Sequence, residues 1–427
     1  MIDWPREFLE GLFRIAVAAA HPASFLAKHL PPPPAGRMIV LAAGKAAGSM
    51  MEVAEGHYLS ILPRDHLLGL AVTRKGYARP TRHIGVVEAG HPVPDQTGLA
   101  ATERTLTLAE QARSDDLVLV LLSGGASANW IAPADGVALA DKQAVTRALL
   151  RSGANISEIN CVRKHLSRIK GGRLARHAHP SKLVTLAISD VPGDDPAVIG
   201  SGPTVPDPST LADARAIVQR YKLDLPDAVH RALADPKNES PKPGDPVFNG
   251  TEFKLIARPA DAFTAARKAV TESGYECIFL GERVEGEARE VAAAHAKLAR
   301  EIKAQGKRAV ILSGGELTVT IKGQGRGGPN QEYALALAAA LDGEQGIAAL
   351  SGDTDGTDGG RGSADDPAGA FVDGASAARG RALGLDAKAR LADNDSTEFF
   401  AQLGDLLNPG PTFTNVNDFR AILVDRP

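Results

Sequence analysis

Short apolar segments alternate along this chain with segments of helical periodicity, and the apolar segments end in polar turns, most of which contain glycine. The apolar segments are continuous rather than alternating with polar residues, which is typical of strands buried on both faces. We therefore predict an α/β fold in which a mostly parallel sheet is covered by helices. The five clearest segments span residues 38–41, 117–122, 183–188, 309–312 and 347–350.

The turns that follow these segments hold most of the candidate site residues. Parallel strands end at one edge of the sheet, and ligands bind beyond that edge. We therefore expect substrate or nucleotide contacts from the residues just after each strand. These residues are Gly44 and Lys45, then Ser123, Gly124 and Gly125, then Asp190, then Ser313 and Gly314, and finally Asp355.

The segment 307–341 shows the pattern most fully. After its first strand comes an alternating strand at 317–321, then a glycine cluster, then an alanine-rich helix that begins near Pro329. Glycines without Cβ let backbone N–H groups approach an anion closely, and a helix start favours negative charge. The sequence therefore predicts a phosphate site here. Its candidate residues are Gly325, Arg326, Gly327 and Asn330.

Carboxylates near strand ends indicate a magnesium site. Asp190, Glu316 and Asp355 each follow a predicted strand, and Mg²⁺ prefers carboxylate oxygens. The alternative is that such aspartates only cap turns. The segment 351–360 also resembles a calcium loop, but it lacks the terminal glutamate of an EF-hand.

Three other features have a structural explanation. We interpret His91, which lies beside a proline, as a structural residue. Ser127 is a weak candidate nucleophile, because a hydrolase elbow places glycine two residues on either side of the serine, and Asn129 occupies the second of these positions. The charged residues of the helix after Asn155 are interpreted as a solvated stripe. That stripe comprises Arg163, Lys164, Arg168, Lys170 and Arg173.

Length and composition predict two domains in a reducing compartment. At 427 residues the chain exceeds one usual core, so we expect domains at 1–235 and 251–427 with a linker at 236–250. The net charge of −3 and the 4% of aromatic residues give no basis for binding nucleic acid or membranes. The two cysteines form no disulfide framework, and we find no targeting segment, which favours the cytoplasm. A homo-oligomer is left open.

A series of motifs in order resembles the glycerate 2-kinase family with its C-terminal MOFRL domain, over roughly residues 35–425. The motifs are GKAAGSM, AGHPVPD, LLSGGASA, INCVRKHLSRIKGGRLA, SDVPGDDPAVIGSGPTVPDPST, LSGGELTV, GRGGPNQE, TDGTDG and TNVND. The resemblance implies phosphorylation of D-glycerate to 2-phosphoglycerate with ATP and Mg²⁺. It also implies two Rossmann-like domains with the active site in the cleft between them.

The resemblance assigns individual residues as well. The family's essential lysine and arginine fall on Lys45 and Arg326, and we place Asp190 beside them as a third catalytic residue. Asn415, in the TNVND motif, is a candidate binding residue. The chain departs from the family at Asp353 and Phe413, where glycine is usual, so its substrate range stays open.

Two alternatives to a kinase follow from the same residues. Gly323, Gly325 and Gly328 satisfy the dinucleotide spacing G-x-G-x-x-G, which would suit an NAD(P)H-dependent hydroxypyruvate reductase. A non-catalytic module that binds sugar acids is the other alternative. Phosphoryl transfer explains more of the sequence, because it uses the cations, the carboxylates and the glycine turns together.

Overall fold

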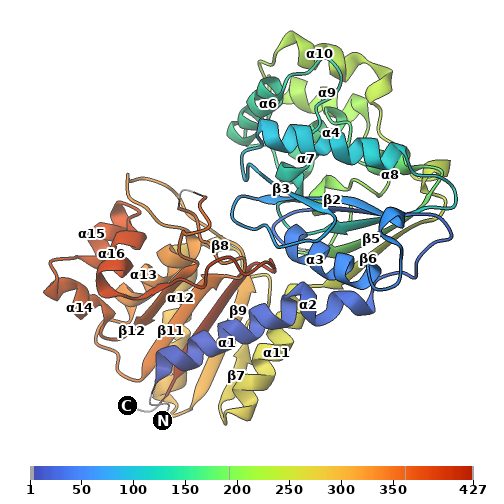
Figure 1. The fold of residues 1–427 in the computed structure, drawn as a ribbon. Helices are drawn as coiled ribbons and strands as arrows, with labels where there is room; N and C mark the ends of the chain where they lie inside the picture. Colours follow the sequence, from blue (N-terminus) through green and yellow to red (C-terminus); the bar gives the residue numbers. More distant parts are fainter. Residues whose placement is uncertain (1–3, 192, 361, 426–427) are drawn as a thin grey trace. The chain divides into compact units, whose positions relative to one another are not determined.

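The chain forms two compact units in the computed structural model, which describes residues 4–191, 193–360 and 362–425 (Figure 1). One unit spans Phe25–Ile256, and the other combines Met1–Ser24 with Ala257–Pro427. These units differ from the division predicted at 1–235, 236–250 and 251–427, because the chain begins in the second unit. Within the described residues, no helix has the length and apolar character needed to cross a bilayer.

The apolar face of the first helix explains this difference. Helix α1 (Pro5–Ala20) buries Leu9, Leu12 and Phe13 by packing along α11 (Pro259–Glu272) and against the second sheet. Residues 236–250 do not form an open linker, since they contain two 3₁₀ turns, η4 (Pro236–Asn238) and η5 (Pro246–Phe248). The chain enters the first unit through α2 (Pro22–Phe25) and η1 (Leu26–Lys28).

The first unit contains a six-stranded parallel sheet in the order β3-β2-β1-β4-β5-β6. All six residues of β1 and of β4 are buried, as their continuous apolar sequences predict. β1 lies between β2 and β4, with Val40 opposite both Gly69 and Leu119. The strands are β1 (Met38–Ala43), β2 (Leu67–Arg74), β3 (Gly85–Ala89), β4 (Leu117–Leu122), β5 (Lys182–Ile188) and β6 (Thr251–Ala257).

Helices cover this sheet and also form a second core beside it (Figure 1). Helix α3 packs against β1, β2 and β4, whereas α4 and α8 share a core with the side chains of the other face. Helices α6, α7, α9 and α10 surround a separate apolar cluster. The helices of this unit are α3 (Ala47–Tyr58), α4 (Gln96–Glu110), α5 (Ala126–Asn129), α6 (Leu139–Arg151), α7 (Ile156–His165), α8 (Arg173–Ala178), α9 (Leu211–Arg220) and α10 (Asp227–Ala234), with 3₁₀ turns η2 (Arg64–His66) and η3 (Ile199–Ser201).

The second unit contains a mixed sheet in the order β13-β12-β11-β14-β9-β7. Only β7 and β9 pair in parallel, and every other neighbouring pair is antiparallel. The prediction of a mostly parallel sheet is therefore wrong for this unit, because burial on both faces does not reveal strand direction. The strands are β7 (Glu276–Phe279), β9 (Ala309–Gly315), β11 (Ile347–Asp353), β12 (Gly369–Asp373), β13 (Leu406–Leu407) and β14 (Asp418–Val424).

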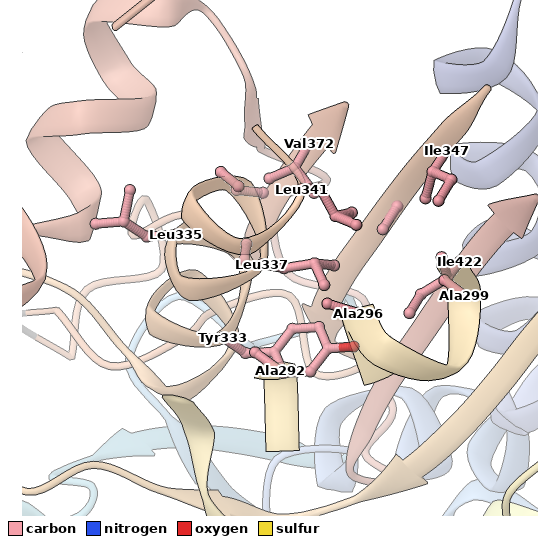
Figure 2. Close-up of a cluster of buried hydrophobic side chains, with 14 of the residues drawn as sticks. Ala292, Ala296, Ala299, Tyr333, Leu335, Leu337, Leu341, Ile347, Val372 and Ile422 are labelled. Atoms are coloured by element: carbon pink, nitrogen blue, oxygen red, sulfur yellow. The ribbon is translucent and has the colours of Figure 1, made fainter. Parts of the chain in front are cut away.

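Two helices rich in alanine build the core on one face of this sheet. Ala292, Ala296 and Ala299 of α12 (Ala288–Ala304) point into the same cluster as Leu337 of α13 (Pro329–Ala340), together with Ile347, Val372 and Ile422 from the strands (Figure 2). Small side chains let the helices approach closely while the apolar area is removed from water. The side chains of α1 and α11 pack against the opposite face, where the rings of Phe263 and Phe419 stack at 5.6 Å.

The remaining elements of the second unit are short. The strand predicted at 317–321 is limited to β10 (Leu317–Thr318), which pairs in parallel with β8 (Gly286–Glu287) outside the main sheet. Near β12 and β13 lie α14 (Ser376–Ala382), α15 (Ala387–Ala392) and α16 (Ser396–Leu403). The turn between α15 and α16 holds the glycine cluster in place, as described below.

Candidate functional site

Two predicted turns meet at the carboxyl edge of the parallel sheet. β1 and β4 end side by side, with Ala43 opposite Leu122. The backbone N–H of Lys45 donates to the carbonyl of Gly124 at 2.7 Å, and the hydroxyl of Ser123 accepts from the N–H of Ala46 at 2.9 Å. These bonds fix the chain on both sides of Lys45.

Glycine is required at two positions of these turns. Gly44 has φ +117°, and a Cβ there would lie 2.3 Å from the Ser123 hydroxyl oxygen. Gly125 has φ +85°, and a Cβ there would lie 3.0 Å from His91 Nε2 and 3.3 Å from Cγ of Lys45. Lys45 and His91 therefore both lie next to Gly125. This proximity could not be predicted from the sequence, because residues 91 and 125 are distant in the chain.

The third turn at this edge contains Asp190. It follows β5, which pairs in parallel with β4, and the Asp190 side chain is partly exposed. Asp195, later in the same turn, accepts from the N–H of Ala197 at 2.9 Å and so caps the turn. Within residues 4–191, 193–360 and 362–425, no group of three or more His, Cys, Asp and Glu residues is placed to hold a metal ion.

The predicted solvated stripe is largely buried, so that interpretation is wrong. Lys164, Lys170 and Arg173 expose at most 7% of their surface, and Arg163 is only partly exposed. Lys164 forms an ion pair with Asp207 at 3.4 Å. The stripe is buried because its members contact segments that are distant in the chain: Lys170 donates to the carbonyls of Ser127 and Trp130, and Arg173 donates to the carbonyl of Asn238. Tertiary packing of this kind leaves no mark on the local sequence.

Ser127 connects two of these cations to the sheet edge. Its hydroxyl oxygen accepts from Arg163 Nη2 at 2.9 Å and from Lys170 Nζ at 3.1 Å, and it lies 2.8 Å from the hydroxyl of Ser201. Ser127 belongs to α5, which begins directly after Gly125. Burial, and then the nearby Arg163, lower the pKa of the Lys170 ammonium well below its usual value.

In the second unit, the glycine cluster is held by the turn between α15 and α16. The backbone N–H groups of residues 322–326 donate to oxygens of Asp393, Asn394 and Asp395 at 2.8 to 3.1 Å. A Cβ at Gly325 would lie 2.3 Å from the Asp395 Cβ, and one at Gly327 would lie 2.2 Å from the Ser396 hydroxyl oxygen. The glycines allow this close packing, and the amides of residues 322–326 are bonded within the protein.

The start of α13 is also occupied. The N–H groups of Asn330 and Gln331 donate to the Asp358 carboxylate at 3.0 and 2.8 Å. Asn330 also donates through its side chain to Asp418 at 2.7 Å and accepts from Ser351 at 2.6 Å. Burial raises the pKa of Asp358 to about 7, with Asp418 contributing, against the hydrogen bonds that favour the charged form.

The other predicted residues of this unit are divided between buried and exposed positions. Ser313 accepts from Arg420 Nε at 3.2 Å, and a Cβ on Gly314 would meet the Phe263 ring. The Asp355 carboxylate caps a turn by accepting from the N–H of Thr357 at 2.8 Å. Two further candidates differ in exposure: Asn415 is buried and Glu316 is exposed.

Comparison with known proteins gives the relationships of the whole chain. Residues 8–234 match a domain of unknown function, DUF4147, and residues 309–418 match the MOFRL family. The D-glycerate 2-kinase of Thermotoga maritima is 40% identical, over 94% of each chain. A crystal structure of glycerate kinase from that organism superposes with a TM-score of 0.85 at 38% identity, covering 98% of this chain and 99% of that one. The chain belongs to the MOFRL/DUF4147 glycerate kinase family. A protein of Agrobacterium vitis named "putative hydroxypyruvate reductase" is 47% identical over 98% of this chain and 94% of its own length.

Two positions where the resemblance implies a departure from the family pattern, Phe413 and Asp353, lie in turns of the second unit. Phe413 adopts φ +58°, in the left-handed region that favours glycine. Asp353 accepts from the N–H of Asp355 at 2.9 Å, so its carboxylate fixes the turn after β11. Both side chains therefore affect the shape of a turn near the carboxyl end of β11. The residues that the family resemblance makes essential, Lys45 and Arg326, are partly exposed and exposed, respectively.

Proposed function

We propose that this glycerate kinase transfers the terminal phosphoryl group of ATP to the 2-hydroxyl of D-glycerate, forming 2-phosphoglycerate and ADP. The observation that carries the proposal is the edge of the parallel sheet, where Lys45 is fixed by the turn after β4 beside Gly125 and His91. A fixed cation at a glycine turn suits the charge of a transferring phosphoryl group. The relatives named as glycerate kinases support the same reaction.

The reaction needs one bond to form and one to break. The oxygen of the substrate 2-hydroxyl attacks the γ-phosphorus, the bond from that phosphorus to the β–γ bridging oxygen breaks, and ADP leaves with that electron pair. In our proposal Lys45 stabilises the charge on the phosphoryl oxygens, and Asp190 accepts the hydroxyl proton or orients the metal. Arg326 is a second phosphoryl-stabilising cation by its family position.

Mg²⁺ is part of this proposal. When bound with the nucleotide, the ion would supply positive charge to the phosphates and would need only one or two protein carboxylates, so a preformed cluster of acids is not required. Asp190 fits this role because it is a partly exposed carboxylate at the edge that holds Lys45. Glu316 and Asp355 are weaker candidates, since Asp355 is buried and already accepts from Thr357. We expect Asp190→Asn to raise the Mg²⁺ concentration that gives half-maximal activity, and an unchanged Mg²⁺ titration would remove Asp190 from the site.

The reductase alternative has a name among the relatives but little support from the geometry. A dinucleotide fingerprint binds the pyrophosphate with loop amides and a helix start. Here the amides of residues 322–326 are bonded to residues 393–395, and the Asp358 carboxylate lies at the start of α13. A pyrophosphate at that helix start would therefore compete with Asp358 for the same N–H groups.

One set of assays separates these functions. Purified protein is incubated with D-glycerate, ATP and Mg²⁺, and separately with hydroxypyruvate and NADH or NADPH. We expect ADP formation and a ³¹P signal split into a doublet, because a phosphate on O2 couples to one proton, whereas one on O3 would give a triplet. Oxidation of the nicotinamide cofactor at comparable turnover would favour the reductase. Binding of D-glycerate without turnover in either assay would favour a binding module.

A further inference from the structure

The cations around Ser127 have no counter-ion among the described residues. Arg163 and Lys170 both donate to the Ser127 hydroxyl, and neither forms an ion pair with a carboxylate that the structure describes. Lys142, 3% exposed, adds a third charge, since its ammonium donates only to the carbonyls of Arg163 and Leu166 at 2.9 and 2.6 Å. The nearest buried carboxylate, Asp207, is paired with Lys164. No described carboxylate therefore pairs with the Arg163 guanidinium, which stays charged because arginine does not lose its proton in proteins.

Unused hydrogen-bond donors accompany this charge. The guanidinium of Arg163 has five N–H groups, but it donates only to Ser127 and to Asn160, at 2.9 and 3.3 Å, and its buried Nε has no partner. Asn129, on the same short helix as Ser127, is fully buried, and both polar atoms of its side chain lack a partner. Structural arginines in a folded core normally have their donors satisfied, because an unpaired buried donor is costly. The pattern points to a ligand.

The position of the cluster identifies the part of the substrate that would bind. Ser127 is partly exposed and lies two residues after Gly125, beside which Lys45 and His91 are placed. Lys45 is assigned to the phosphoryl group. Arg163, which donates to Ser127, is therefore available for the other charged group that takes part in the reaction. That group is the carboxylate of the hydroxy acid, and a planar guanidinium matches a carboxylate with two parallel hydrogen bonds.

We infer that Arg163 binds the substrate carboxylate and thereby makes the enzyme select a 2-hydroxy acid over a neutral polyol. Ser127 and Lys170 are positioning residues: Ser127 orients the guanidinium, and Lys170 holds α5 through the carbonyls of Ser127 and Trp130 at 2.7 and 3.1 Å. This inference rests on the proposed function, because it assigns one end of the same substrate.

The test compares Arg163→Met with a matched control on the same charged segment. Arg168→Met also removes a partly exposed arginine, but Arg168 contacts the carboxylates of Glu103 and Asp135 rather than the Ser127 cluster. For Arg163→Met we expect KM for D-glycerate to rise about tenfold to a hundredfold, as for the loss of a charged hydrogen bond, with KM for ATP within about twofold of the wild type. Arg168→Met should leave both constants near their wild-type values.

A neutral substrate separates carboxylate binding from a structural role. Wild-type enzyme should prefer D-glycerate strongly over D-glyceramide. Arg163→Met should lose most of that preference, because removing the guanidinium weakens the binding of the charged D-glycerate and leaves the binding of neutral D-glyceramide unchanged. Arg163→Lys should recover part of the preference, since it restores the charge without the planar fork. Thermal unfolding of each variant establishes that it is folded. A folded Arg163→Met that keeps the wild-type preference would overturn the inference.

The failure of this inference can be told apart from failure of the proposed function. If wild-type protein phosphorylates D-glycerate and Arg163→Met retains its KM, only the assignment of Arg163 fails. If wild-type protein forms no ADP with D-glycerate, the proposed function fails. Calorimetric titration with D-glycerate and D-glyceramide, with a non-hydrolysable ATP analogue present, then still decides whether Arg163 recognises the carboxylate, and equal binding by wild type and Arg163→Met would reject it.

Discussion

The backbone N–H of Lys45 donates to the carbonyl oxygen of Gly124 at 2.7 Å, which joins the turns after two neighbouring parallel strands. The lysine side chain therefore starts from a point fixed by both β1 and β4. Because Lys45 is already held in place, its surroundings need not rearrange when charge develops on a phosphoryl group. A charged side chain that is held in place in this way stabilises the transition state more than the ground state, which accelerates the reaction.

Replacing Lys45 tests this role directly. Lys45→Met keeps much of the side-chain volume and the backbone hydrogen bond but removes the charge. We expect kcat to fall by a factor of about a hundred or more, with little change in the free energy of unfolding. Lys182→Met is the control, because Lys182 is exposed at the opposite, amino end of β5. Near-normal kcat in Lys45→Met would exclude Lys45 from the chemical step.

The crowding at Gly44 predicts that an alanine there lowers the free energy of unfolding by more than the left-handed backbone angle alone would. Gly44→Ala places a Cβ 2.3 Å from the Ser123 hydroxyl oxygen at φ +117°, whereas Gly136→Ala, at φ +77°, meets no atom within 4 Å. Gly136→Ala should cost about 1–2 kcal/mol for the left-handed conformation. Gly44→Ala should cost more in urea unfolding and should also lower activity. An equal loss of stability in Gly44→Ala and Gly136→Ala would contradict the prediction, because it would show that the turn makes room for the Cβ at Gly44.

Arg326 should matter for activity and little for stability. Its side chain is exposed, and its backbone is held by Asp395 whatever the side chain is. We expect Arg326→Ala to reduce kcat by about a hundredfold, with only partial recovery in Arg326→Lys, because a point charge does not reproduce the planar guanidinium. Lys322→Ala, an exposed cation on the same loop, is the control. If Lys322→Ala loses as much activity as Arg326→Ala, the effect is one of general charge.

Asp358 predicts a pH dependence of stability. Burial and the neighbouring Asp418 raise the pKa of Asp358 to about 7 in the folded protein, above its usual value of about 4. The folded state therefore keeps a proton that the unfolded state has released. The stability from this group is complete below pH ~4 and is lost as the pH rises through about 7.

Unfolding in urea at pH 5 and pH 8 measures this effect. We expect the free energy of unfolding to fall between these values, and to fall less in Asp358→Asn, which cannot titrate. Asp342→Asn is the control, since the pKa of Asp342 is lowered by its exposed pair with Arg381 and it stays ionised throughout this range. An identical slope for wild type and Asp358→Asn would contradict the shifted pKa.

The sequence located the strands well but not their directions. The predicted strand at 117–122 matches β4, and the other four predicted strands begin within one residue of β1, β5, β9 and β11. Continuous apolar composition reports burial on two faces, which is the same for parallel and antiparallel neighbours. The place of β14 between β11 and β9 depends on packing between distant segments, so the mixed sheet was not predictable.

The site residues show the same limit. Lys45, Ser123 and Gly125 could be chosen from local sequence, because strand ends and glycine turns are local features. The burial of Lys170 could not, since its ammonium donates to the carbonyls of Ser127 and Trp130, some 40 residues earlier in the chain. The glycine cluster shows the same limit: its amides can be counted in a sequence, but partners at 393–395 cannot be assigned from it.

The central place of β14 has a consequence for the order in which the protein matures on the ribosome. α1 packs along α11 and against β14 (Asp418–Val424), which are synthesised about 240 and 400 residues after it. At about 5–20 residues per second, the part of α1 that faces β14 therefore stays uncovered for roughly 20 to 80 seconds. Residues 25–256 contain a complete sheet of their own and can fold during that time. Helix α1 is therefore a segment that we expect nascent-chain chaperones to hold, and a chain truncated before α11 should leave α1 open to protease.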